Sequence, residues 1–187
     1  MMKIENKNSK IFLICGKARH GKTTMGNIIK EYYENKNMKV ANTLIALYLK
    51  TYAKQFFGWD GSDETKPREL LQQLGTEVIR QKLNKPMFFI DRTIDDIEIL
   101  SHFFDAIIID DIRFPLEIES IKEKYPNTIV IKMIRPNFES NLTKNQSKHA
   151  TEIALDNYDN SNYDYIITND SSIEDLKNKV YRILDEV

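Results

Sequence analysis

The stretch IFLICGKARHGKT, residues 11–23, decides the fold. Its apolar first part, residues 11–15, breaks into the pattern G-x-x-x-x-G-K-T, and residues 24–33 continue with helical spacing. The glycines let the backbone curl so that successive N–H groups converge, and the next helix adds its positive end. An ordinary strand-to-helix turn explains the glycines but not Lys22 and Thr23 at the helix start. We therefore predict a nucleoside triphosphate site here.

The residues of this loop have distinct expected roles. We expect the triphosphate cradle to consist of Gly16, Gly21, Lys22 and Thr23. Lys22 reaches the outer phosphates, and the Thr23 hydroxyl ligates Mg²⁺. Thr24 follows directly and either caps the helix or contacts an α-phosphate.

Composition favours one folded domain with a small-molecule ligand. The 187 residues suffice for a single domain over 1–187, and 41% of them are hydrophobic. Lys and Arg number 27 against 28 Asp and Glu, so the net charge is −1. This balance gives no electrostatic case for nucleic acid or a membrane as partner, and a homodimer is left open. Cys15 is the single cysteine, which excludes an intrachain disulfide.

The localisation expected from the sequence is cytoplasmic. Residues 1–8 carry charges without a long apolar segment after them, unlike a signal peptide. No stretch approaches the length of a membrane span.

Apolar runs alternate with helical patterns along the chain. Strand-like runs cover 11–15, 38–42, 106–109, 128–134 and 165–167, and helical patterns cover 24–34, 44–57, 67–83, 86–103, a stretch from Pro115, and 173–184. Buried strands separated by helices indicate a parallel sheet covered on both faces. The fold class predicted is α/β, the three-layer P-loop NTPase fold, with an added lid segment.

Polar residues follow the strand-like runs, where parallel strands would gather them at one edge. Asp110 and Asp111 end the run 106–109, so one carboxylate should lie near the magnesium, although such an acid can also cap the next helix. Asp111 and Arg113 lie on the same side of an extended chain, where they would position the metal and grip an acceptor phosphate. The sequence leaves open which of the two aspartates approaches the metal.

Two further loops should reach this edge. Arg135 follows the run 128–134 and opens a polar segment, residues 135–159, which we interpret as a lid. A guanidinium there would bridge donor and acceptor phosphates, or form a salt bridge at the base of the lid. Asn169 follows the last strand and is a candidate contact for an adenine edge.

The helical stretch 67–83 carries a polar face. Gln72, Thr76 and Arg80 are spaced four apart and therefore share one side, which solvent alone could explain. Gly75 is less ordinary, because a glycine inside a helix costs about 1 kcal/mol relative to alanine. It indicates either close approach of a neighbour or ligand, or a kink.

The chain resembles the bacteriophage-type deoxynucleoside monophosphate kinases, a branch of the P-loop nucleotide kinases. The segments that carry this resemblance are GKARHGKTT at 16–24, LLQQLGTE at 70–77 with Arg80, IDDIRF at 109–114 with Glu117, IRP at 134–136, HATE at 149–152 and ITNDSS at 167–172. The resemblance implies transfer of the ATP γ-phosphate to a nucleoside monophosphate. It implies that Lys22 and Thr23 serve ATP and Mg²⁺.

The same resemblance implies an acceptor side, which we place in the helical region 43–103. Arg68, Thr76 and Arg80 would line it, and we add Gln72 from the same face. Asp111 and Arg113 would face metal and acceptor, and Arg135 would belong to the closing region. Two alternatives stay open: a P-loop kinase of another phosphorylated small molecule, similar to dephospho-coenzyme A or phosphomevalonate kinases, and a non-kinase ATPase. One departure is the short stretch between Gly58 and Arg68, which puts the base specificity in doubt.

Overall fold

A five-stranded parallel sheet forms the centre of the protein. The computed structural model describes residues 4–136, 138 and 142–187. The sheet runs in the order β2-β3-β1-β4-β5 and every neighbouring pair is parallel. Its strands are β1 (Lys10–Cys15), β2 (Val40–Thr43), β3 (Ala106–Ile112), β4 (Ile129–Ile134) and β5 (Tyr165–Thr168).

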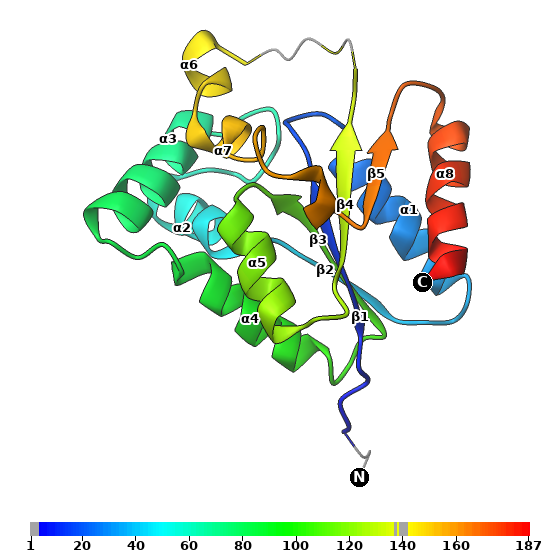
Figure 1. Ribbon diagram of the computed structural model, residues 1–187. Helices are drawn as coiled ribbons and strands as arrows, with labels where there is room; N and C mark the ends of the chain where they lie inside the picture. The colour runs from blue at the N-terminus through cyan, green and yellow to red at the C-terminus, as the bar shows by residue number, and fades with distance from the viewer. Residues whose placement is uncertain (1–3, 137, 139–141) are drawn as a thin grey trace.

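Helices cover both faces of this sheet (Figure 1). One face carries α1 (Lys22–Glu34) and α8 (Ile173–Glu186), and the other carries α4 (Phe88–Leu100) and α5 (Pro115–Lys124). The remaining elements are α2 (Leu47–Phe57), α3 (Arg68–Gln72), the π-helix η1 (Gln73–Lys82), α6 (Lys144–Ser147), α7 (Ala150–Ile153) and the 3₁₀ turn η2 (Asn160–Asn162). The predicted three-layer α/β fold is confirmed.

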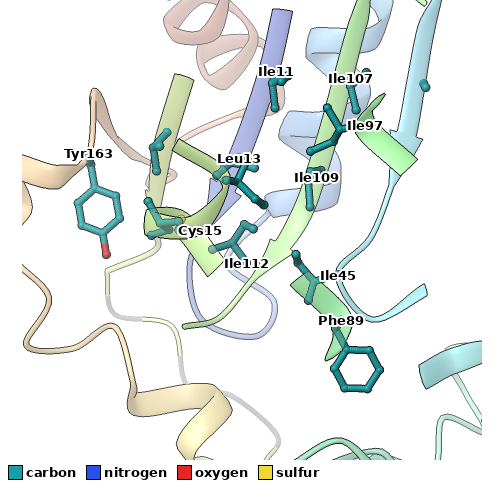
Figure 2. Packing of buried hydrophobic residues seen from close by; sticks show 14 of the residues in the cluster. Ile11, Leu13, Cys15, Ile45, Phe89, Ile97, Ile107, Ile109, Ile112 and Tyr163 are labelled. Atoms are coloured by element: carbon teal, nitrogen blue, oxygen red, sulfur yellow. The ribbon is translucent and has the colours of Figure 1, made fainter. Parts of the chain in front are cut away.

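The hydrophobic core consists of two clusters, one on each face of the sheet, because strand side chains alternate between the two faces. Phe12 and Ile14 of β1 pack with α1 and α8, whereas Leu13 packs on the side of α4 and α5. Figure 2 shows the cluster on the side of α4 and α5, in which Ile107 of β3 lies beside Ile11 and Ile109 lies beside Leu13. Both faces of a strand such as β1 are therefore apolar, which explains its unbroken hydrophobic run.

The predicted helix over 67–83 is divided in the structure. Its first part is α3, and its second part widens into the π-helix η1. A Cβ built on Gly75 would lie 2.9 Å from Leu49 Cδ2, so the glycine admits the side chain of α2 against the wide turn. Close approach and altered helix geometry therefore coincide at this residue. Sequence periodicity missed the π-helix, because its apolar positions also fit an α-helix.

The polar segment 135–159 is partly helical. Residues 137 and 139–141 lie outside the described residues, so the expected lid is described only in part. The rest contains α6, which Thr143 caps by accepting the Gln146 N–H, and α7. Within the described part of the chain, no helix combines the length and the apolar character needed to span a membrane.

Candidate active site

The loop between β1 and α1 takes a shape that requires glycine at both ends. Gly16 has a φ of 146°, and a Cβ there would lie 2.7 Å from the Met133 carbonyl oxygen. Gly21 has a φ of 101°, and a Cβ there would lie 2.7 Å from Asn169 Nδ2. L-residues with side chains rarely adopt such angles, so the pattern G-x-x-x-x-G follows from backbone geometry and from β4 and Asn169 packed behind it.

Lys22 folds back over this loop. Its Nζ donates to the Gly16 carbonyl at 2.8 Å and to the Lys17 carbonyl at 2.7 Å. The residue is only 8% exposed, and burial, together with the nearby Arg113 guanidinium, lowers the pKa of Lys22 to about 7. An anion in the loop would oppose both effects and favour the charged lysine.

The start of α1 opens into a large groove. The helix begins at Lys22, so the N–H groups of its first turn have no acceptor within the helix. Thr23 is exposed and Thr24 is half-buried, and both line a groove of about 1010 Å³. Free N–H groups and the helix dipole favour an anionic ligand at this position.

Asp110 and Asp111 point to different sides of β3, as consecutive strand residues do. Asp111 is half-buried, and its carboxylate accepts the N–H groups of Ile45 at 2.7 Å and Ala46 at 3.1 Å. Asp110 lines the groove on the side of α1, with Oδ2 3.8 Å from a Cβ built on Gly26. Its carboxylate has no hydrogen bond within the described residues. Asp111 thus orders the segment before α2, while Asp110 is available to the groove.

Arg113 joins the groove to α7. Its Nη1 lies 3.3 Å from the Gly16 carbonyl oxygen and 3.1 Å from Glu152 Oε1. The other Glu152 oxygen accepts the Ala18 N–H at 3.0 Å. The Arg113 guanidinium therefore lies beside the glycine-bounded loop, and its expected contact with an acceptor phosphate stays a prediction.

A second, smaller cavity of about 170 Å³ lies beside the groove. It is lined by Gln72, Thr76 and Arg80, which the sequence placed on one helix face and which the π-helix still brings together. Thr76 is 6% exposed, and its hydroxyl has no hydrogen-bond partner among the described residues. Because Thr76 belongs to the cavity wall, its unpartnered hydroxyl is a candidate to bond a polar ligand atom.

The wall between the two cavities is strongly cationic. The residues that line both are Lys50, Lys66, Arg68, Asp111 and Arg113. Burial and the neighbouring Lys50 lower the pKa of Lys66, which indicates cations held close together. Four cations against one carboxylate give this wall a net positive charge, which favours an anion.

Arg135 and Asn169 also reach the groove. The exposed Arg135 guanidinium lies 4.4 Å over the Phe138 ring, and its backbone N–H donates to His20 Nδ1 at 3.2 Å. Asn169 Nδ2 donates to the His20 carbonyl at 3.1 Å. The structure therefore brings all of the sequence-predicted site residues to the groove, to the small cavity or to the loop that borders them.

Three contributors were not assigned to the site from the sequence. Lys50 and Lys66 are isolated lysines in a lysine-rich chain, and only the meeting of α2 with the loop before α3 makes them part of one wall. Glu117 follows the segment IDDIRF, and in the structure it is a buried residue of the cavity wall that bonds to Arg80. A glutamate three residues into a helix signals a cap, not a cavity residue.

A strand, a glycine-bounded loop and a helix on this parallel sheet define a P-loop protein. Residues 48–180 match the sequence model of the deoxynucleotide monophosphate kinases, and the chain belongs to this family. A deoxynucleotide monophosphate kinase of Enterobacteria phage T4 is 30% identical over 122 residues, which are 65% of this chain and 46% of that protein. The chain thus spans about half the length of this curated relative.

Solved structures share the fold at low identity. A dephospho-CoA kinase from Campylobacter jejuni superposes with a TM-score of 0.54 at 14% identity, covering 96% of this chain and 97% of that one. A thymidylate kinase from Ehrlichia chaffeensis gives 0.53 at 13% identity, covering 94% and 98%. Shikimate kinase from Acinetobacter baumannii gives 0.51 at 14%, covering 95% and 93%. These likenesses support the three-layer fold and nothing more specific.

Proposed function

We propose that the protein transfers the γ-phosphoryl group of ATP to a (deoxy)nucleoside 5′-monophosphate. The observation that carries this proposal is the cationic wall common to the groove and the small cavity. A kinase of this kind must hold two phosphate groups end to end, one from each substrate. Membership of the deoxynucleotide monophosphate kinase family supports the same acceptor class.

ATP would occupy the groove. Gly16, Gly21 and Lys22 would hold its outer phosphates, and the hydroxyls of Thr23 and Thr24 lie beside them. Asn169 would contact adenine through its carboxamide oxygen, because Nδ2 already donates to the His20 carbonyl. Phosphate charge would also keep the buried Lys22 protonated.

The donor set suits Mg²⁺ bound together with ATP. Mg²⁺ is usually held by one or two carboxylates, with phosphate oxygens and water completing its shell. Thr23, Asp110 and Asp111 line the same groove, but the Asp111 carboxylate is already bonded to two backbone N–H groups. When bound there, the ion would neutralise charge on the transferring phosphoryl group. We assign direct ligation to Thr23 and Asp110, and a supporting role to Asp111.

The nucleoside monophosphate would occupy the small cavity. Its phosphate would lie at the shared wall against Arg68 and Arg113, and its base would lie deeper, near Gln72, Thr76 and Arg80. An acceptor phosphate oxygen would attack the γ-phosphorus while the bond to the β–γ bridging oxygen breaks and ADP leaves. Lys22, Arg113 and Arg135 would stabilise the charge on the oxygens in transfer.

We infer that the segment 135–159 closes over both substrates. It begins at Arg135 beside the groove, and its later part already contacts the P-loop through Glu152 and Asp156. Closure would exclude water, which competes with the acceptor for the phosphoryl group. The helical region 43–103 supplies the acceptor side in this arrangement.

A coupled ADP-release assay across the common ribo- and deoxyribonucleoside monophosphates tests the proposal. We expect strong stimulation of ADP release by at least one of them. Arg113→Ala should raise the acceptor KM far more than it weakens ATP binding, because its guanidinium belongs to the wall where the acceptor phosphate would bind. Arg182→Ala, an exposed site on α8, is the matched control. Bound ATP without stimulation by any monophosphate would refute the proposal.

A further inference from the structure

Glu117 is a buried carboxylate in the wall of the acceptor cavity. It is 1% exposed and lies in the first turn of α5. Buried carboxylates are costly unless their oxygens are well bonded, so each partner of Glu117 is informative.

The two oxygens of Glu117 have separate partners. Oε2 accepts the backbone N–H groups of Arg113 at 2.7 Å and Phe114 at 3.0 Å, which caps α5. Oε1 accepts Arg80 Nη2 at 3.0 Å. Capping requires Oε2 alone, and the bond to Arg80 is therefore an additional function of the second oxygen.

Arg80 is held from several sides. Its guanidinium carbon lies 5.1 Å from the centre of the Phe89 ring and 4.6 Å from that of Phe114. Nη1 lies 3.4 Å from the Gly75 carbonyl oxygen. Among these contacts Glu117 supplies the charged one, so it holds the guanidinium in place against the two rings.

We infer that Glu117 is the positioning residue of the acceptor site, holding Arg80 in place and fixing the backbone at Arg113. One carboxylate thereby sets the geometry of two guanidinium groups that line the acceptor cavity. This inference rests on the proposed function, in which the cavity receives the nucleoside monophosphate. Glu117 itself is almost fully buried and acts through Arg80.

Glu117→Gln separates the two functions of the carboxylate. The amide oxygen can still accept the N–H groups of Arg113 and Phe114, so the cap on α5 remains. The amide NH₂ then faces Arg80 Nη2, and two donors cannot bond to each other. The matched control is Glu123→Gln, an exposed glutamate on the same helix.

Steady-state kinetics at pH 8 provide the first test. We expect Glu117→Gln to raise the acceptor KM about tenfold while kcat and the ATP KM change less than about threefold, because a charge-assisted bond is lost on the acceptor side alone. Glu123→Gln should match the wild type. An unchanged acceptor KM in Glu117→Gln, or an equal rise in the ATP KM, would overturn the inference.

A double-mutant cycle distinguishes positioning from a general loss of structure. In an Arg80→Met background, Glu117→Gln should raise the acceptor KM by less than about threefold further, because its partner is already absent. Independent, multiplicative effects of the two substitutions would show that Glu117 does not act through Arg80.

Arginine-labelled NMR provides a readout that needs no turnover. The side-chain ¹⁵N–¹H signals of Arg80 should be protected from exchange in the wild type and should lose protection in Glu117→Gln. If the exchange protection of the Arg80 signals is the same in Glu117→Gln as in the wild type, the inference is contradicted, whatever the activity of the variant. A wild-type enzyme inactive on every monophosphate, with the Arg80 signal responding as expected, would instead refute the proposed function and leave the positioning of Arg80 intact.

Discussion

Arg113 and Glu152 form an ion pair that connects the loop after β3 to α7. Arg113 Nη1 lies 3.1 Å from Glu152 Oε1, and the two side chains are 23% and 10% exposed. The other oxygen of the same carboxylate accepts the Ala18 N–H of the P-loop. One carboxylate therefore joins three segments that are far apart in the sequence, and its loss should affect the P-loop and Arg113 together.

Glu152→Gln should lower kcat/KM about tenfold, because an amide keeps one acceptor oxygen but loses the charge that holds the Arg113 guanidinium. Steady-state kinetics with both substrates varied will measure this effect. Asp156→Asn is the matched control. Asp156 follows α7 and also pairs with the P-loop, through Lys17, but its side chain is 41% exposed. Exposed pairs contribute little, so this control should stay near the wild type. Equal losses in both variants would contradict the role of Glu152.

We expect the protein to take up a proton when it binds ATP at pH 8. Burial and Arg113 lower the pKa of Lys22 to about 7, so its amine is mostly neutral at pH 8 in the free protein. Phosphate charge raises that pKa, and the amine then gains a proton on binding. Calorimetry in buffers of different ionisation enthalpy measures the uptake, which should disappear in Lys22→Met.

Lys22 should also contribute to the pH dependence of the stability of the free protein. Between pH 7 and 10.5 the folded protein binds fewer protons at Lys22 than the unfolded chain, so this group makes the free energy of unfolding rise with pH. Lys22→Met should flatten that rise in thermal or urea unfolding. A wild-type profile identical to that of the variant would show that Lys22 has an ordinary pKa.

Changing Asp110 or Asp111 to asparagine should affect different properties, the Mg²⁺ requirement in one case and the melting temperature in the other. Asp110→Asn should raise the Mg²⁺ concentration needed for half-maximal activity about tenfold, with the melting temperature nearly unchanged, because it removes a free carboxylate from the groove. Asp111→Asn replaces the charged acceptor of the Ile45 and Ala46 N–H groups, and its main effect should be a lower melting temperature. Magnesium titrations and thermal unfolding separate the two, and reversed results would exchange the assignments.

Thr76→Val should weaken acceptor binding without destabilising the free protein. The buried Thr76 hydroxyl has no partner among the described residues, so its removal should raise the free energy of unfolding by about 1 kcal/mol. The acceptor KM should rise several-fold if that hydroxyl binds the nucleoside. Thr93→Val is the contrasting control, because the equally buried Thr93 hydroxyl donates to the Phe89 carbonyl at 2.9 Å. That control should lose stability and keep its KM.

Much of the fold could be predicted from local sequence. The apolar run of β1 and the glycines after it placed the P-loop, because left-handed φ angles and close backbone contacts leave few residue types to choose from. The alternation of buried strands with helices indicated the parallel sheet. The π-helix could not be foreseen, since it depends on Leu49 of a different helix packing against Gly75.

The sequence by itself determined the P-loop, the order of strands and helices, and the residue types that gather where the strands end. Only the tertiary structure decided that Asp111 caps a backbone segment while Asp110 faces the groove, and that Lys50 and Lys66 join Arg68 and Arg113 in one wall. The physical reason is the separation along the chain of the residues that interact. Backbone angles and burial patterns are set by neighbours in the chain, whereas charges meet across a cavity only after distant segments have packed.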